Sequence, residues 1–311
     1  KRENANIDGD TAMGTMLKYG SEGAKYYVDN YVLPKEMAKA HIGGDIHIHD
    51  KDFYMLTETC CQIDLIKLFK DGFCTGHGYL RAPQSIMSYA SLACIAIQAN
   101  QNEMHGGQSV PNFDYSMAPG VAKTYVKEYY DALAQSLAVR LGIGYADACA
   151  IAKNIKKELP SPTLSNADAF EAELCKWFTQ ADDKFGLDGK VLVAAHKNAA
   201  ETALASTDKA TFQAMEALVH NLNTMNSRAG AQVPFSSVNY GTDTSPEGRM
   251  VMKNLLLATD NGLGNGETPI FPIHIFKIKD GINYNPGEPN YDLFKLACRV
   301  SAKRLFPNFS F

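Results

Sequence analysis

The chain has 311 residues, of which 45% are apolar, and its 30 basic and 34 acidic side chains give a formal net charge of −4. This composition supports a sizeable folded core, and the absence of a dense lysine and arginine run argues against a surface that tracks a nucleic acid backbone. No window approaches the roughly 18 uninterrupted apolar residues of a membrane span, and no signal-peptide apolar stretch follows the first residues, so we expect a cytoplasmic protein that does not cross a membrane.

The first half of the chain is predicted to be mainly helical. A helical pattern covers residues 21–40, and residues 42–48 then alternate apolar with polar side chains as an extended segment would. Further apolar helices are expected at residues 86–99 and in the region that Pro119 opens.

The second half alternates between helix and strand. A helix is expected at residues 209–225, a strand at 232–240, a helix at 246–259 and a strand at 270–278. A final helix follows Asn290, with one apolar stripe made of Tyr291, Phe294, Cys298, Ala302 and Leu305. This alternation indicates an α/β core with mostly parallel strands.

The seven cysteines argue against a disulfide framework and against a structural zinc site. Their number is odd, and no two have the Cys-x-x-Cys spacing of a zinc knuckle or a thioredoxin-type site. We therefore expect no metal site in this chain.

Two adjacent cysteines, Cys60 and Cys61, are the leading candidates for chemistry, because they follow soon after a segment rich in acids and imidazoles. A disulfide between neighbours would close a strained ring, and on a strand only one of the two side chains faces a given cavity. A catalytic thiol needs a lowered pKa or a redox partner elsewhere in the fold, and a plain packing role is the alternative.

His47 and His49 lie two residues apart, so on a strand they would share one face, with Asp45 and Asp50 nearby. Metal ligation, contact with a substrate and a hydrogen-bonded strand end are the possible interpretations. The lack of a third ligand at a suitable spacing disfavours a metal.

Residues 105–112 (HGGQSVPN) combine two glycines with polar side chains. This composition suits a loop that brings backbone N–H groups close to an anion, and it also suits a plain turn. The segment has neither the ending of a phosphate-binding Walker loop nor the glycine spacing of a dinucleotide-binding turn.

Seven short segments are not decisive one by one, but their order and spacing together form a specific pattern. They are residues 46–52 (IHIHDKD), 59–65 (TCCQIDL), 105–109 (HGGQS), 232–235 (QVPF), 270–272 (IFP), 289–292 (PNYD) and 301–304 (SAKR). In these segments the chain resembles the anaerobic, class III ribonucleoside-triphosphate reductases, which are glycyl radical enzymes. The resemblance runs over nearly the whole chain.

The resemblance implies a ten-stranded α/β barrel of two half-sheets, with a central loop that carries a thiyl-radical cysteine. It also implies reduction of ribonucleoside triphosphates to 2′-deoxyribonucleoside triphosphates, in which a glycyl radical oxidises the loop cysteine and the thiyl takes the 3′ hydrogen. A second cysteine, on the first barrel strand, helps to protonate the departing 2′-oxygen and supplies an electron. Formate is the usual final reductant in one large subgroup.

By its position Cys60 matches that second cysteine, so the resemblance implies that Cys60 is catalytic and that Cys61 faces away from it. Substrate-binding positions are implied at His49, Cys61 and Gln232, of which His49 matches a histidine near the family's substrate pocket.

The resemblance also implies that the glycine-rich segment is a loop that reports which effector nucleotide, ATP or a deoxynucleoside triphosphate, is bound across a homodimer interface. Gly106 and Gly107 would make this loop mobile, and Gln108, Ser109 and Asn112 would read base edges.

The chain departs from the family pattern where the radical is generated. No cysteine matches the thiyl cysteine, since Cys298 falls within the final helix, and the glycyl-radical segment, its adjacent four-cysteine zinc site and the amino-terminal ATP-binding cone are missing. We therefore expect residues 1–311 to form a single, incomplete barrel region that does not turn over substrate alone. A radical-SAM activase is the implied partner of the complete enzyme.

Two other functions compete with the reductase. Another glycyl radical enzyme, such as a formate acetyltransferase or a diol dehydratase, shares the barrel, although residues 59–64 (TCCQID) favour the reductase. A nucleotide-binding relative that has lost catalysis would lack the radical loop and the radical glycine in its complete gene.

Overall fold

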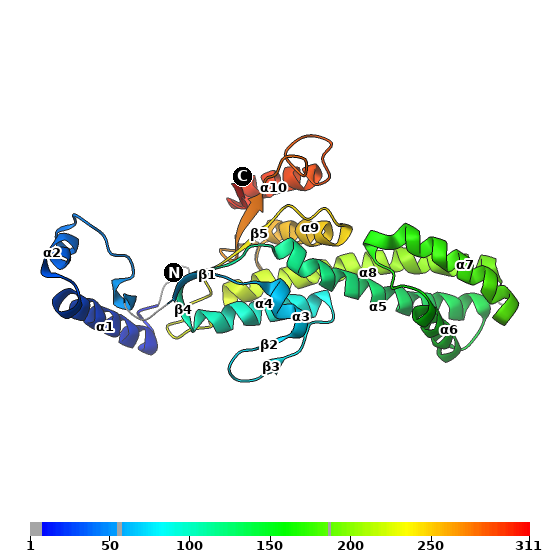
Figure 1. Cartoon of the computed structure of the whole chain (residues 1–311), viewed down its shortest axis with the longest axis horizontal. Helices are drawn as coiled ribbons and strands as arrows, with labels where there is room; N and C mark the ends of the chain where they lie inside the picture. Colours follow the sequence, from blue (N-terminus) through cyan, green and yellow to red (C-terminus); the bar gives the residue numbers. More distant parts are fainter. Residues whose placement is uncertain (1–7, 55–57, 186–187) are drawn as a thin grey trace.

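The computed structural model describes residues 8–54, 58–185 and 188–311. Within these residues an amino-terminal arm, a central sheet with its covering helices, and a helical extension follow one another along the longest axis (Figure 1). No helix in the described part of the chain combines the length and the apolar character needed to cross a membrane.

The amino-terminal arm is built from α1 (Ala12–Tyr27), a π-helical turn (Val28–Val32), α2 (Lys35–Gly43) and a 3₁₀ turn (Lys51–Phe53). The single helix expected at residues 21–40 is wrong, because Pro34 interrupts it. A proline disfavours helical backbone in the residue before it, and Leu33 accordingly has extended backbone, with φ −73° and ψ 143°.

A five-stranded sheet forms the centre of the molecule, and all of its neighbouring strands are parallel. Its strands, in spatial order, are β1 (Glu58–Gln62), β4 (Met104–Val110), β5 (Ser236–Tyr240), β6 (Ile273–Lys277) and β7 (Asn308–Ser310). The expected α/β core with parallel strands is therefore confirmed. A small antiparallel pair, β2 (Phe73–Cys74) and β3 (Tyr79–Leu80), lies apart from it.

The ten strands of a complete barrel are not found in the described residues, which contain seven strands in two sheets. The two strands expected in the second half are shorter than predicted, since β5 begins after Pro234 and β6 directly after Pro272. A proline has no backbone N–H to donate to a sheet, so a strand commonly begins beyond it.

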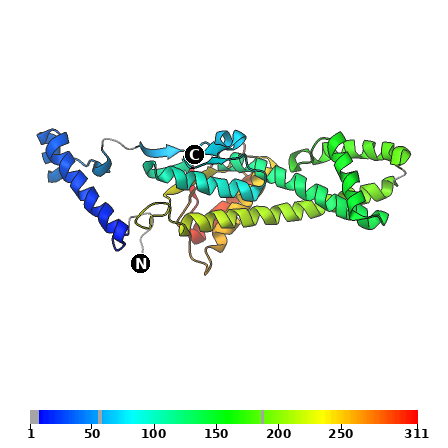
Figure 2. The same cartoon turned by 90° about the horizontal axis from the view of Figure 1, so that it is seen from below.

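Helices cover one side of the sheet and continue beyond it. The described helices that complete the fold are α3 (Leu65–Asp71), α4 (Ile86–Gln101), α5 (Phe113–Leu141), α6 (Tyr145–Glu158), α7 (Ala167–Phe185), α8 (Gly189–Thr224), α9 (Pro246–Asn261) and α10 (Tyr291–Arg304), with a 3₁₀ turn at Leu164–Asn166. The main core joins the sheet to α4, α9, α10 and the adjoining parts of α5 and α8. The far parts of α5 and α8 form a second core with α6 and α7, away from the sheet (Figure 2).

Helix α5 begins earlier than predicted. Pro119 was expected to open the helix, but the helix starts at Phe113 and contains the proline. The missing N–H of Pro119 costs one backbone hydrogen bond. Full burial of Phe113, Met117 and Val121 on one face holds this segment helical around the proline.

The apolar stripe predicted for α10 is also wrong. Its buried positions are Leu293, Ala297, Val300 and Arg304, whereas Cys298, Ala302 and Leu305 of the predicted stripe are exposed. Arg304 takes a core position because its guanidinium donates to the carbonyl oxygens of Asp260 (2.6 Å) and Gly266 (2.9 Å). A pattern of apolar residues cannot predict that an arginine is buried, because its burial depends on hydrogen bonds to distant carbonyl groups.

Candidate functional site

Cys60 lies at an irregularity where β1 pairs with β4. Thr59 is opposite His105 and Cys61 is opposite Gln108, so Cys60 alone is opposite both Gly106 and Gly107. This is a β-bulge, and its backbone is unusual on both strands, with φ of +42° at Cys60 and +106° at Gly106. A cysteine in the left-handed region is rare, and such outliers persist where neighbouring contacts hold them.

The two adjacent thiols have different surroundings. Cys60 is exposed, whereas Cys61 is half-buried, packs against the main core and accepts a hydrogen bond on Sγ from Asn100 Nδ2 of α4 at 3.0 Å. Cys61 is thus turned toward the helices. The thiol with access to a ligand is Cys60.

Both glycines of β4 have close neighbours. A Cβ on Gly106 would lie 3.0 Å from Cys60 Sγ and 3.3 Å from Cys60 N, and a Cβ on Gly107 would lie 3.3 Å from the Phe235 ring. At Gly106 the close approach coincides with a positive φ, a combination that favours glycine.

We expect Gly106→Ala to lower the free energy of unfolding by about 2–3 kcal/mol, because it combines a strained φ with a contact against Cys60. Gly76→Ala is the matched control, since Gly76 has φ +90° but no atom within 4 Å of the added Cβ, and it should cost only about 1 kcal/mol. Chemical denaturation of both variants measures the difference. Equal losses would show that the contact with Cys60 contributes nothing.

The glycine-rich segment is a strand and not the expected loop. Residues 104–110 form β4 in the interior of the sheet, and the two glycines lie in the bulge of this strand, not in a mobile loop. Gln108 is buried and accepts from Asn100 Nδ2 (2.7 Å), while Ser109 Oγ lies 3.4 Å from Asn239 Oδ1. Asn112, just beyond the strand, accepts from Lys277 Nζ at 3.0 Å. That these residues contact an effector nucleotide stays a prediction.

A polar cavity of about 510 Å³ lies between the amino-terminal arm and the start of β4. Its lining gathers four imidazoles with other charged and polar side chains, and comprises Lys25, His41, His47, Ile48, His49, Asp50, Lys51, Asp52, His105 and Gln232. His49 and Gln232, both expected to bind substrate, therefore line one cavity. Cys60 does not line it, and neither does Cys61.

Asp50 joins two imidazoles across this cavity. Its carboxylate oxygens lie 3.2 Å from His49 Nε2 and 3.3 Å from His105 Nε2, and the His105 ring stacks on Phe53 with centroids 4.0 Å apart. His105 Nδ1 is buried and has no hydrogen-bond partner among the residues that the structure describes. Asp50 was noted in the sequence only as an acid near His47 and His49, and His105 only as the first residue of the glycine-rich segment.

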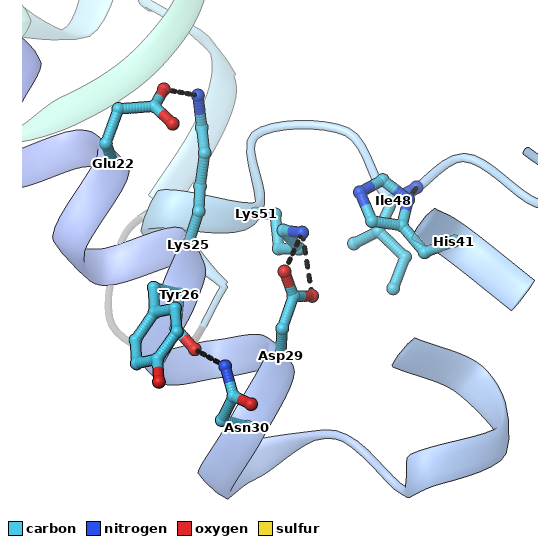
Figure 3. A network of polar contacts seen from close by, with 8 residues as sticks. All are labelled: Glu22, Lys25, Tyr26, Asp29, Asn30, His41, Ile48 and Lys51. Carbon is cyan, nitrogen blue, oxygen red and sulfur yellow. Dashed lines mark hydrogen bonds and ion pairs between the residues drawn. The ribbon is translucent and has the colours of Figure 1, made fainter. Parts of the chain in front are cut away.

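The strand expected at residues 42–48 is absent, because α2 runs to Gly43 and Gly44 ends it in a left-handed conformation. The following chain folds back, and Ile48 N donates to His41 Nδ1 at 3.1 Å (Figure 3). His47 therefore lies between His41 and His49, with ring centroids 5.8 Å from each. A turn, and not a strand face, brings these histidines together.

A buried ion pair fixes the turn that carries the histidines. Lys51 is 7% exposed, and its Nζ lies 2.7 Å from both carboxylate oxygens of Asp29 (Figure 3). Removing either partner would leave an uncompensated buried charge. The pair ties the histidine turn to the π-helical turn of the arm.

Comparison with known proteins identifies the family. A family model described as anaerobic ribonucleoside-triphosphate reductase matches residues 3–311. The chain belongs to this family. The resemblance seen in the sequence segments is thereby confirmed.

Individual relatives carry the same name but are much longer. The chain is 26% identical to the anaerobic ribonucleoside-triphosphate reductase of Salmonella typhimurium and 27% identical to that of Enterobacteria phage T4. Each match covers 98% of this chain, but only 35% and 41% of those two proteins. The chain thus spans well under half the length of the reductases that it matches.

A solved reductase shares the fold. The anaerobic ribonucleotide reductase from Thermotoga maritima with dATP bound in the specificity site superposes with a TM-score of 0.51, over 95% of this chain and 43% of that one. At 12% sequence identity this match supports a common fold alone.

In this reductase-family chain, no group of three or more histidine, cysteine, aspartate or glutamate side chains among the described residues could hold a metal ion. The imidazoles of the polar cavity instead contact Asp50, a backbone N–H and one another. The arrangement supplies hydrogen-bond donors and acceptors to whatever enters the cavity.

Proposed function

We propose that this chain is part of the catalytic barrel of an anaerobic ribonucleoside-triphosphate reductase, and that Cys60 is a catalytic residue. The observation that carries the proposal is the exposed Cys60 thiol on a strained bulge of the first strand. Membership of the reductase family supports the reaction class. Deoxynucleoside triphosphates made from ribonucleoside triphosphates are the proposed products.

The proposed chemistry removes the 2′-hydroxyl of the ribose. When present, the glycyl radical and the loop cysteine would remove the 3′ hydrogen of the ribose. Cys60 then gives a proton to the leaving 2′-oxygen, which departs as water, and supplies one electron. Over a full cycle formate provides two electrons and one proton and leaves as CO₂: one electron and a proton restore the Cys60 thiol, and the other electron, with a proton from solvent, completes the reduction of the ribose. A thiol suits this position because sulfur can give both a proton and an electron.

Because His49 and Gln232 line the polar cavity, we propose that they contact the substrate or the reductant. Imidazoles donate or accept hydrogen bonds, as a ribose or a formate ion requires. Cys61, engaged by Asn100, would support this site from the helical side. We propose ATP and deoxynucleoside triphosphates as effectors, which agrees with the dATP bound to the Thermotoga maritima relative.

The complete enzyme needs more than the parts described above. We propose that further strands complete a ten-stranded barrel, that a separate segment carries the radical glycine next to a four-cysteine zinc site, and that a radical-SAM activase generates the radical. A homodimer in the cytoplasm is the proposed state. The length of the relatives supports the presence of these further parts, since this chain covers only 35% to 41% of them.

The test uses the natural full-length protein, incubated anaerobically with its radical-SAM activase. A glycyl doublet in the electron paramagnetic resonance spectrum, together with deoxynucleotide formation from ribonucleoside triphosphates and formate, would support the proposal. A doublet without any deoxynucleotide, with formate or with a thioredoxin system, would point to another glycyl radical enzyme. A natural gene without the radical glycine would point to a nucleotide-binding relative that has lost catalysis.

A further inference from the structure

The last turn of α4 reaches the two strands that carry the bulge. The side-chain amide of Asn100 donates to Cys61 Sγ at 3.0 Å and to Gln108 Oε1 at 2.7 Å. An amide NH₂ has two hydrogens, so both bonds can form at once. Cys61 and Gln108 are paired across β1 and β4, immediately after the bulge.

The Asn100 side chain therefore bridges β1 and β4 directly beside Cys60, whose backbone is strained. Cys60 has φ +42°, a conformation that costs energy for any residue with a Cβ. Such backbone persists only where its surroundings determine it. Asn100 holds the residue after Cys60 on one strand and the residue after Gly107 on the other.

Asn100 can act as a fixed support because its own helix end is anchored on both sides of it. Gln98 Nε2 donates to Asn221 Oδ1 of α8 at 2.6 Å, and Gln101 Nε2 donates to Val233 O at 3.1 Å. The Arg228 guanidinium also donates to the carbonyl oxygens of Gln101 and Met104. The end of α4 and the start of β4 are thereby both held by the segment from Arg228 to Val233.

We propose that Asn100 is a positioning residue for the catalytic thiol, a role that rests on the function proposed for Cys60. By holding the Cys61 sulfur on the helical side, Asn100 leaves Cys60 as the one thiol of the pair that faces a ligand. It also fixes the register at the bulge, and so the direction of the Cys60 side chain. Without Asn100, Cys61 is free to turn outward and compete with Cys60 for protons and electrons.

The experiment measures the two thiols separately in the natural full-length protein, before any treatment with the activase. Alkylation by iodoacetamide is followed by fragment mass spectrometry, which resolves Cys60 from Cys61, and exposed Cys175 of α7 serves as the internal reference. Asn100→Ala and the isosteric Asn100→Asp remove the donor. Asn102→Ala is the matched control, because the Asn102 amide bonds only to Gln98 O within its own helix end.

For both Asn100 variants we expect the ratio of Cys61 to Cys60 alkylation rates to rise about two- to tenfold, the range that loss of one ordinary hydrogen bond predicts. Asn102→Ala should leave the ratio unchanged. A merely structural role would lower stability without moving this ratio. An unchanged ratio in folded Asn100→Ala overturns the proposal, and so does failure of both Asn100 variants to fold, since that outcome assigns Asn100 to general stability.

The same variants then separate this proposal from the function on which it rests. In the full-length enzyme, Asn100→Ala should lower kcat with little change in KM, because the thiol and not the substrate cavity is disturbed. The alkylation result does not depend on turnover. Altered thiol reactivity in a protein without reductase activity would therefore reject the proposed function and leave the positioning role standing.

Discussion

Cys60→Ser in the full-length enzyme should abolish deoxynucleotide formation and leave the glycyl radical signal intact. A serine hydroxyl cannot supply an electron and is a far weaker acid than a thiol, so the step at the 2′-oxygen fails. Loss of the proton donor alone predicts at least about a hundredfold lower turnover. Product formation is measured by chromatography, and the radical by electron paramagnetic resonance of the same samples.

Cys61→Ser is the matched control for this prediction. Serine can still accept the hydrogen bond from Asn100, and Cys61 faces the helices, so this variant should retain most of the activity. If Cys60→Ser turned over at close to the unmodified rate, the wrong thiol would have been chosen. If only Cys61→Ser lost activity, the roles of the two cysteines would be exchanged.

The sequence predicts the general architecture and draws attention to the cysteine pair, because both depend on local signals. Alternating strand and helix patterns led to the parallel sheet, and the adjacent cysteines marked β1. The resemblance then assigned Cys60 its role, which the exposure of Cys60 and the engagement of Cys61 make physically reasonable.

The bulge could not be predicted, because it is a property of two paired strands. Gly106 and Gly107 have the composition of a mobile loop when β4 is considered alone. Paired with β1, the two glycines lie opposite the single residue Cys60, so β4 has one residue more than β1 at this point. Only the pairing partner distinguishes the two interpretations.

The polar contacts of the site were missed for a similar reason. Asn100 lies just beyond the helix predicted at residues 86–99, and His105 begins the segment that was expected to be a loop. Their partners, Cys61 and Asp50, lie far away in the sequence. Hydrogen bonds between distant segments leave no periodic signal in either segment.

A buried histidine gives the second large prediction, which concerns acid. His274 on β6 is fully buried, and its Nδ1 lies 2.9 Å from the Tyr240 hydroxyl of β5. Its Nε2 lies 3.4 Å from Thr259 Oγ1, whose hydroxyl already donates to Leu255 O. The ring is therefore neutral, with Nδ1 accepting from tyrosine and Nε2–H directed at threonine.

Burial lowers the pKa of His274 from 6.5 to about 3. In the unfolded chain the imidazole takes up a proton as the pH falls below about 6.5, but in the folded chain it does not until about pH 3. The stabilising contribution is thus complete above pH 6.5 and is lost as the pH falls. Between these values the free energy of unfolding should fall by about 1.4 kcal/mol for each pH unit through this group alone.

Denaturant unfolding of the unmodified chain and of His274→Gln at several pH values between 7.5 and 4.5 measures this contribution. Glutamine keeps polar atoms in the site but does not titrate, so below pH 6.5 the variant curve should be flatter by about 1.4 kcal/mol per pH unit. The difference between the curves isolates His274, because every other titrating group is common to both proteins. Parallel curves for His274→Gln and the unmodified chain would mean that the imidazole takes up its proton within the folded core, and that the Tyr240 contact does not require the neutral ring.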